Sequence, residues 1–221
     1  MSLRVGKLIV IDGIDGSGKT TQVELLTKYL TEKNIPFEII SFPQYGKNKY
    51  AIQIKKYLQG KMGRIEDLDP YSIAKLYASD RLTVKDLIRG WLDQGKLVIA
   101  NRYVSSNKAH QGANLVDKER EKFLKWLEEL EYQTNGMPKP NLTILLKLDA
   151  KVGQQNAIKD HLKDIHEENL VHEEKAAKIY LKLSKTEKNW AVVNCMDDGV
   201  MRIPQDIHQE IIRILSDKLP T

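Results

Sequence analysis

The sequence predicts an α/β fold in which a five-stranded parallel sheet is flanked by helices. Three observations support this prediction. Short apolar, β-branched runs alternate with longer segments of helical spacing along the 221 residues. Each connection between successive runs is helical, which favours parallel strands. A glycine-rich turn joins the first apolar run to the first helical segment.

The first strand and the first helix enclose a phosphate-binding sequence. Residues 13–20 read GIDGSGKT and match G-x-x-x-x-G-K-[S/T] at every fixed position. Glycines let successive N–H groups point at an anion, and the following helix adds its positive N-terminal end. The chain is therefore expected to bind a nucleoside triphosphate, as P-loop NTPases do. The expected phosphate-binding residues are Gly13, Ile14, Asp15, Gly16, Ser17, Gly18, Lys19, Thr20 and Thr21.

Two side chains of this loop have expected roles in the chemistry. Lys19 is expected to reach the β- and γ-phosphates, and the Thr20 hydroxyl to bind the Mg2+ that accompanies them. A chance glycine turn is the alternative interpretation. It does not account for the strand and helix patterns that flank the turn.

Composition limits the classes of protein and partner. With 41% hydrophobic and 29% charged residues, the chain can bury one core, so a single domain over residues 1–221 is expected. A formal charge of +5 suits a polyanionic ligand, either a nucleotide or a nucleic acid. One cysteine, Cys195, excludes an internal disulfide and favours a cytoplasmic protein. Strand residues begin almost at once and no apolar run reaches about 18 residues, so neither a signal peptide nor a membrane partner is expected.

The remaining elements follow in order along the chain. Strands are expected over residues 7–12, 37–42, 96–100, 142–148 and 190–194. Helices are expected over residues 20–30, 50–59, 69–94, 104–111, 118–132, 149–183 and 204–219. Polar residues follow each strand, and open parallel sheets bind ligands at the carboxyl ends of their strands.

Two side chains on the expected 69–94 helix are candidates for this site. Tyr77 and Arg81 lie four residues apart, so they share one helix face. For an isolated pair of this kind, a packed tyrosine beside a solvated arginine is the simpler interpretation.

The charged segment after residue 149 also has two interpretations. It is either a solvated helix face or a flap whose cations, such as Lys159 and Lys163, close over bound phosphates. Its histidines, His161, His166 and His172, lack the spacing of a metal-binding motif, so no metal site is predicted there.

Five motifs occur in a fixed order along nearly the whole chain. They are DGIDGSGKTTQ at 12–22, FP at 42–43, YASDR at 77–81, NRYVSSNKAHQG at 101–112 and PKPNL at 138–142. Together they resemble the thymidylate kinase family, within the P-loop nucleoside monophosphate kinases. The resemblance implies that fold type with a helical lid around residues 150–172, transfer of a phosphoryl group from Mg-ATP to dTMP giving dTDP, and a homodimer.

The resemblance also implies roles for the acceptor-site residues. Tyr77 corresponds to an aromatic residue that stacks on thymine, and Arg81 to an arginine that bonds the base edge. Arg102 corresponds to an arginine that holds the monophosphate, which suits its planar fork of donors. Asp15 corresponds to a carboxylate that contacts the deoxyribose 3′-hydroxyl near the transferred phosphate. The other residues expected at the dTMP site are Phe42, Tyr45, Leu58, Ser106, His110 and Gln111.

Three positions depart from the family's pattern. Asn101 replaces an aspartate that is linked to Mg2+ and the phosphates, and Tyr45 stands where some members carry a phosphate-binding arginine. Family members also place an arginine in the phosphate loop or in the lid. This chain has Gly16 in the loop and no arginine between Arg120 and Arg202.

The missing arginine leaves several functions open. An arginine aimed at the transition state contributes about 10^3- to 10^5-fold in rate, and a lysine supplies charge without the bidentate fork. Lys159 and Lys163 are the expected catalytic substitutes in the lid, with His166 as a further one, beside Lys19, Arg102 and Asp15. The alternatives are a divergent monophosphate kinase with altered substrate or weak activity, and a nucleotide-dependent nucleic-acid-binding protein. ATP and dTMP are the expected partners, and nucleic acid is the less expected one.

Overall fold

The computed structural model describes residues 6–64, 67–159 and 170–216. Its centre is a five-stranded parallel sheet in the order β2-β3-β1-β4-β5, which confirms the predicted fold class. The strands are β1 (Lys7–Asp12), β2 (Phe37–Ser41), β3 (Leu97–Asn101), β4 (Leu142–Lys147) and β5 (Trp190–Asn194). Each predicted strand boundary agrees with the structure to within one residue.

Strand β1 occupies the middle of the sheet. It pairs with β3 on one side, where Ile9 lies opposite Ile99, and with β4 on the other, where Ile11 lies opposite Ile144. All of its residues after Lys7 are buried, because helices cover both faces of the sheet. This explains why the sequence of β1 is a continuous apolar run that ends at a polar residue.

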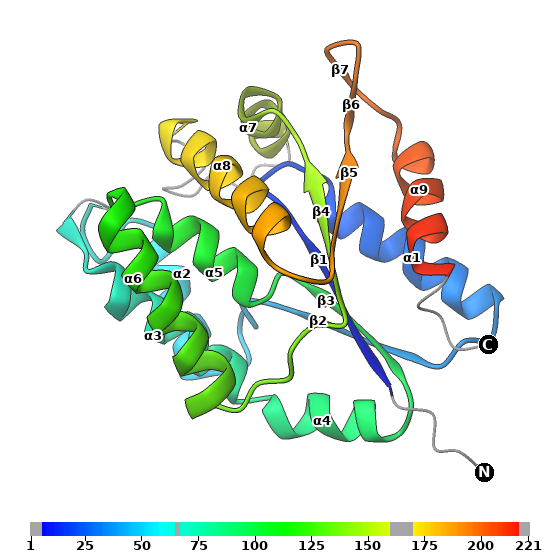
Figure 1. The fold of residues 1–221 in the computed structure, drawn as a ribbon, viewed down its shortest axis with the longest axis horizontal. Coiled ribbons are helices and arrows are strands. Elements are labelled where there is room, and N and C mark those ends of the chain that lie inside the picture. The colour runs from blue at the N-terminus through cyan, green and yellow to red at the C-terminus, as the bar shows by residue number, and fades with distance from the viewer. Residues whose placement is uncertain (1–5, 65–66, 160–169, 217–221) are drawn as a thin grey trace.

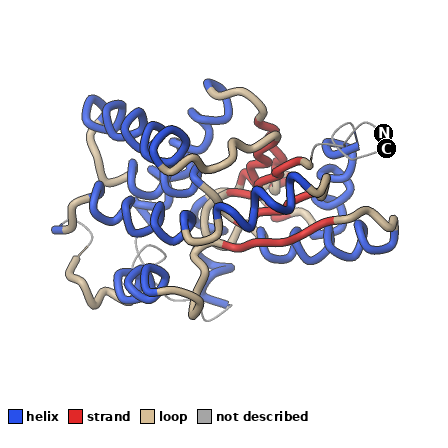
Figure 2. Tube along the Cα trace, turned by 90° about the horizontal axis from the view of Figure 1, so that it is seen from below, coloured by secondary structure: helices blue, strands red, loops and turns tan. Residues whose placement is uncertain are grey.

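Helices lie on both faces of the sheet (Figure 1). On one side are α1 (Lys19–Glu32) and α9 (Pro204–Ser216), and on the other are α5 (Val104–Gly112) and α8 (Leu170–Thr186). Figure 2 shows the strands gathered at the centre with helices around them. The remaining elements are α2 (Lys49–Leu58), α3 (Pro70–Leu82), α4 (Lys85–Asp93), α6 (Asp117–Glu128), the π-helical turn η2 (Glu129–Thr134), α7 (Ala150–Lys159), β6 (Met196–Asp197) and β7 (Val200–Met201).

The prediction of one helix over residues 69–94 was wrong, because α3 ends at Leu82 and α4 begins at Lys85. The Thr83 hydroxyl donates to the Asp80 carbonyl at 2.7 Å and accepts from the Gln44 amide at 3.1 Å. These side-chain bonds offer the backbone an alternative to continuing the helix. The predicted start is confirmed, since the Asp69 carboxylate caps the first turn.

Two other helical predictions are also corrected. The segment predicted as one helix over residues 118–132 is α6 followed by η2, which runs on to Thr134. The segment predicted over residues 149–183 contains α7 and α8, and residues 160–169 lie outside the described part. Within the described ranges, no helix is both long and apolar enough to cross a membrane.

Candidate functional site

A cavity of about 660 Å³ opens at the carboxyl edge of the sheet. The phosphate loop forms one wall, and the ends of β2 and β3 with residues of α2, α3 and α5 form the others. This volume is typical of small-molecule sites. All ten residues predicted for the acceptor site line the cavity: Asp15, Phe42, Tyr45, Leu58, Tyr77, Arg81, Arg102, Ser106, His110 and Gln111.

The phosphate loop lies between the end of β1 and the start of α1 and borders the cavity. Its residues Gly16, Gly18, Lys19, Thr20 and Thr21 line the cavity, whereas Gly13, Ile14 and Ser17 are buried beneath it. Gly18 has φ 83° where α1 begins, a conformation that is costly for other residues. The Lys19 ammonium donates to the Ile14 carbonyl at 2.6 Å and so holds the loop closed.

The pKa of Lys19 depends on the charges around the phosphate loop. Burial, and then the neighbouring Arg102 guanidinium, lower the pKa of Lys19 to about 8. The Asp15 carboxylate, 3.9 Å from the ammonium, opposes that shift. An anion bound in the loop adds negative charge beside Lys19 and therefore favours its protonated form.

Arg102 lies at the floor of the cavity, directly after β3. Its guanidinium forms an ion pair with the Asp15 carboxylate, donates to the Gly13 carbonyl at 3.3 Å and lies 3.5 Å from the Ser106 hydroxyl. The fourth neighbour is His110 Nε2, at 3.4 Å. Arg102 has φ 66°, a left-handed conformation that costs about 1–3 kcal/mol outside glycine and recurs at functional sites.

Arg81 is buried beneath the cavity wall with an acidic partner. It is 1% exposed, and its Nε donates to Glu131 of η2 at 3.0 Å while Nη2 makes a second bond to the same carboxylate. The solvated-arginine interpretation was therefore wrong. The predicted shared face is confirmed, since Tyr77 and Arg81 both line the cavity. Sequence reasoning missed Glu131, because nothing in its acidic surroundings distinguishes it from exposed neighbours.

Asp12 ties the phosphate loop to the two helices on one side of the sheet. Its buried carboxylate accepts from Ser105 and Ser106, each at 2.6 Å, and from the Tyr180 hydroxyl at 2.7 Å. It also accepts from the Gly13 N–H at 2.9 Å. Tyr180 was not singled out from the sequence, where its position in α8 resembles ordinary helix packing. The network fixes α5 and α8 against the loop.

The predicted magnesium ligand has a second oxygen-bearing group beside it. Thr20 is exposed at the cavity, and the Asn101 amide donates to its hydroxyl at 3.4 Å. Mg2+ prefers oxygen ligands and keeps several waters, with one or two protein groups and substrate phosphates completing its shell. The Thr20 hydroxyl fits that pattern, and the Asn101 side chain carries an oxygen on the same amide group whose nitrogen faces that hydroxyl.

Helix α7, in the predicted lid, packs directly on the phosphate loop. A Cβ atom added to Gly16 would lie 2.0 Å from the Gly153 carbonyl oxygen, so the two backbones touch. The Asn156 amide donates to the Gly16 carbonyl at 3.1 Å. In this arrangement position 16 has no room for an arginine side chain.

The predicted lid cations are not placed by the structure. Lys159 is the last residue of α7, and Lys163 and His166 lie outside the described residues. Their catalytic role stays a prediction. A cation that sequence reasoning missed, Lys55 of α2, does line the cavity.

Comparisons of the sequence with known proteins all match thymidylate kinases. The family model described as thymidylate kinase matches residues 11–207. A thymidylate kinase from Sulfurihydrogenibium sp. is 32% identical over 218 residues, covering 97% of this chain and 98% of the relative. The thymidylate kinase of Homo sapiens is 28% identical over 219 residues, covering 98% and 92%.

Structural comparison supports the same fold. The solved thymidylate kinase of Candida albicans, whose description reports broad substrate specificity, superposes with a TM-score of 0.76 at 22% identity. The match covers 96% of this chain and 92% of that one. Because the family model spans most of the sequence and the sheet order and loop agree with it, this chain is a member of the thymidylate kinase family, a group of nucleoside monophosphate kinases.

Proposed function

We propose that the protein transfers the γ-phosphoryl group of Mg-ATP to dTMP, giving dTDP and ADP. One observation carries the proposal: the phosphate loop opens into the same cavity as Tyr77, Arg81 and Arg102. Donor and acceptor phosphates held there face each other, which is what in-line phosphoryl transfer needs. Family membership supports the choice of dTMP as the acceptor.

Each group of the site has a proposed role. The loop amides and Lys19 hold the donor phosphates, and Thr20 with Asn101 would hold Mg2+, which supplies charge neutralisation when it is bound. Arg102 grips the acceptor phosphate with its planar fork. Asp15 holds Arg102 in place and is the proposed contact for the 3′-hydroxyl.

Base recognition is proposed for the wall formed by α3 and α5. Tyr77 offers an aromatic face to the base, and Arg81 is fixed by Glu131 so that it is held in one orientation. A second candidate is a monophosphate kinase with a different base preference. His110 favours it, because an imidazole that contacts α8 lines the cavity where the family often has tyrosine or phenylalanine.

The assembly and location belong to the same proposal. Homodimer formation and a cytoplasmic site of action are inferred from family membership. Sedimentation of the purified chain tests the dimer.

A coupled assay for ADP tests the reaction with dTMP, dUMP, UMP, CMP, AMP and GMP as acceptors. We expect the highest kcat/KM with dTMP. Arg102→Lys should lower kcat/KM at least about tenfold, because lysine lacks the fork. Arg89→Lys, on α4 at an exposed position, is the matched control and should leave the rate unchanged. ADP release that ignores the acceptor, or binding of nucleic acid that weakens steeply with salt, would contradict the proposal.

A further inference from the structure

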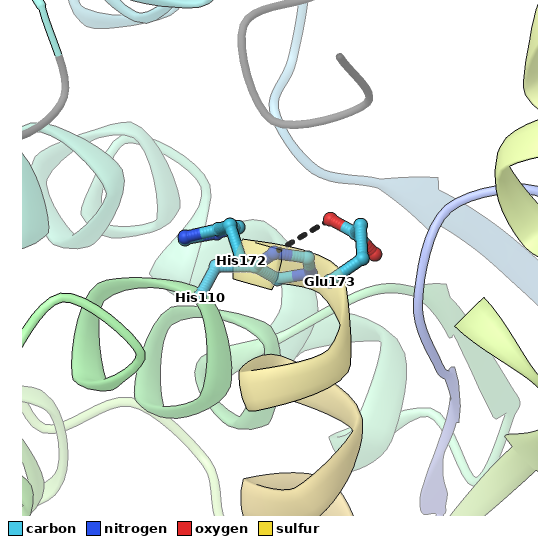
Figure 3. Close-up of side chains that lie close together, drawn as sticks. All are labelled: His110, His172 and Glu173. Atoms are coloured by element: carbon cyan, nitrogen blue, oxygen red, sulfur yellow. Dashed lines mark ion pairs between the residues drawn. The ribbon is translucent and has the colours of Figure 1, made fainter. Parts of the chain in front are cut away.

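A cluster of buried titratable groups lies at one wall of the cavity, where α5 meets α8. His110 comes from α5, and His172 and Glu173 come from α8, as Figure 3 shows. All three are less than a tenth exposed. None of the roles assigned above uses His172 or Glu173, yet the cluster touches the residue that is proposed to hold the acceptor phosphate.

The hydrogen-bonding roles in this cluster follow from the donors around it. The Arg102 guanidinium can only donate, and its Nη1 lies 3.4 Å from His110 Nε2, so Nε2 is the accepting nitrogen. The proton of neutral His110 is then on Nδ1. Glu173 Oε1 lies 3.7 Å from Nδ1, at ion-pair distance, as the dashed line in Figure 3 marks.

The second oxygen of Glu173 closes a ring. Glu173 Oε2 accepts from the Asp15 backbone N–H at 3.2 Å. The Asp15 carboxylate in turn forms the ion pair with Arg102. Four residues, Arg102, His110, Glu173 and Asp15, thus form a closed circuit that joins β3, α5, α8 and the phosphate loop.

The imidazole of His110 is held in this orientation from both sides. The His172 ring stacks on it with a centroid distance of 5.7 Å and an interplanar angle of 26°. The Tyr180 ring meets it edge-on at 5.9 Å. His172 Nδ1 is itself fixed by the Asn114 side-chain oxygen at 3.1 Å. The stack leaves His110 Nε2 aimed at Arg102.

We propose that Glu173 and His110 are positioning residues for Arg102, so that helix α8 sets the orientation of the group that binds the acceptor phosphate. The inference rests on the proposed function, since it concerns the phosphate contact of that same site. Glu173 Oε1 accepts no hydrogen bond from any described residue, so a small approach to His110 strengthens the circuit. Burial, and then the Asp15 carboxylate, raise the pKa of Glu173 to about 8, and the Arg102 guanidinium opposes that shift.

A metal ion is the competing occupant of the same cluster. One ligand atom from each of His110, His172 and Glu173 lies within 4.8 Å of the others. The Arg102 guanidinium argues against it, because a positive group donating to His110 disfavours a cation on that ring.

The test separates phosphate binding from nucleoside binding. Titration calorimetry measures dTMP and thymidine affinity in the wild type, Glu173→Gln, Arg102→Lys and the double variant. We expect Glu173→Gln to weaken dTMP binding about tenfold and to leave thymidine binding unchanged, with no further loss in the Arg102→Lys background. Glu174→Gln, the next residue on α8, is the control and should bind both ligands as the wild type does.

Other outcomes overturn the inference. Equal loss for dTMP and thymidine indicates a general structural role, and additive losses show that Glu173 acts independently of Arg102. Stoichiometric binding of Co2+ to chelator-treated wild type, abolished in Glu173→Gln, assigns the cluster to a metal instead. If the wild type phosphorylates dTMP while Glu173→Gln binds it normally, only the positioning inference fails; if the wild type neither binds nor phosphorylates dTMP, the proposed function fails with it.

Discussion

Replacing Glu131 by glutamine tests how the acceptor wall is held together. Glu131 is 0% exposed and pairs with Arg81, which is 1% exposed. Glutamine keeps the shape and one acceptor oxygen but removes the charge. The Arg81 guanidinium then stays buried with the Tyr103 carbonyl, at 3.5 Å, as its other acceptor.

The expected cost follows from this burial. Removing one partner of a buried ion pair costs about 3–5 kcal/mol, because the remaining charge is not compensated. For a chain of this length, 1 kcal/mol corresponds to roughly 2–4 °C in Tm. We therefore expect Glu131→Gln to lower Tm by about 10 °C. The KM for dTMP should also rise, since Arg81 loses its fixed orientation.

Thermal unfolding followed by circular dichroism measures the first effect, and the coupled ADP assay measures the second. Glu129→Gln is the matched control, because Glu129 lies on the same turn and is exposed. It should change Tm by less than about 1 °C, as surface substitutions do. Equal melting of Glu131→Gln and the wild type would refute the reasoning, since it would mean that the Arg81 charge is solvated in the folded protein.

Three further substitutions or reactions test other parts of the structure. Gly153→Ala should raise the KM for ATP, because the added Cβ would lie 2.5 Å from the Asp15 carbonyl oxygen and push α7 away from the phosphate loop. Gly90→Ala is the control, because its Cβ would meet open space. It should stabilise α4 by about 0.5–1 kcal/mol. Asn101→Asp should hold or raise kcat at saturating Mg2+, because a carboxylate adds charge at the proposed metal site; a large loss would show that the amide has a role of its own. Burial raises the pKa of the Cys195 thiol to about 12, so a disulfide reagent at pH 8 should label it only after unfolding, and prompt labelling of the native protein would contradict its burial.

The fold was predictable because its information is local. The buried strands are continuous apolar runs, and the loop motif requires its residues at fixed spacing. The break after Leu82 was not predictable, because it depends on hydrogen bonds from Thr83 to Asp80 and from Gln44 to Thr83. Gln44 lies far from Thr83 in sequence and meets it only in the folded chain.

The residues of the candidate site also differ in whether they could be predicted from local sequence. Residues in the ordered motifs, such as Tyr77 and Arg102, could be predicted because each motif stands at a fixed place in the sequence, and both residues line the cavity. Glu131 and Glu173 were missed because the contact of each is with a residue on another element. The spacing of histidines within residues 161–172 could not reveal the stack of His172 on His110, since one of the two rings belongs to α5.

The contact between Gly16 and Gly153 links the evolution of two distant positions. Any side chain introduced at position 16 first requires the backbone of α7 to move away, and any side chain at position 153 meets the loop. A lineage that gains a loop arginine must therefore reposition this helix at the same time. In relatives of this protein, residues 16 and 153 should vary together, and grafting the arginine alone should loosen the helix before it speeds catalysis.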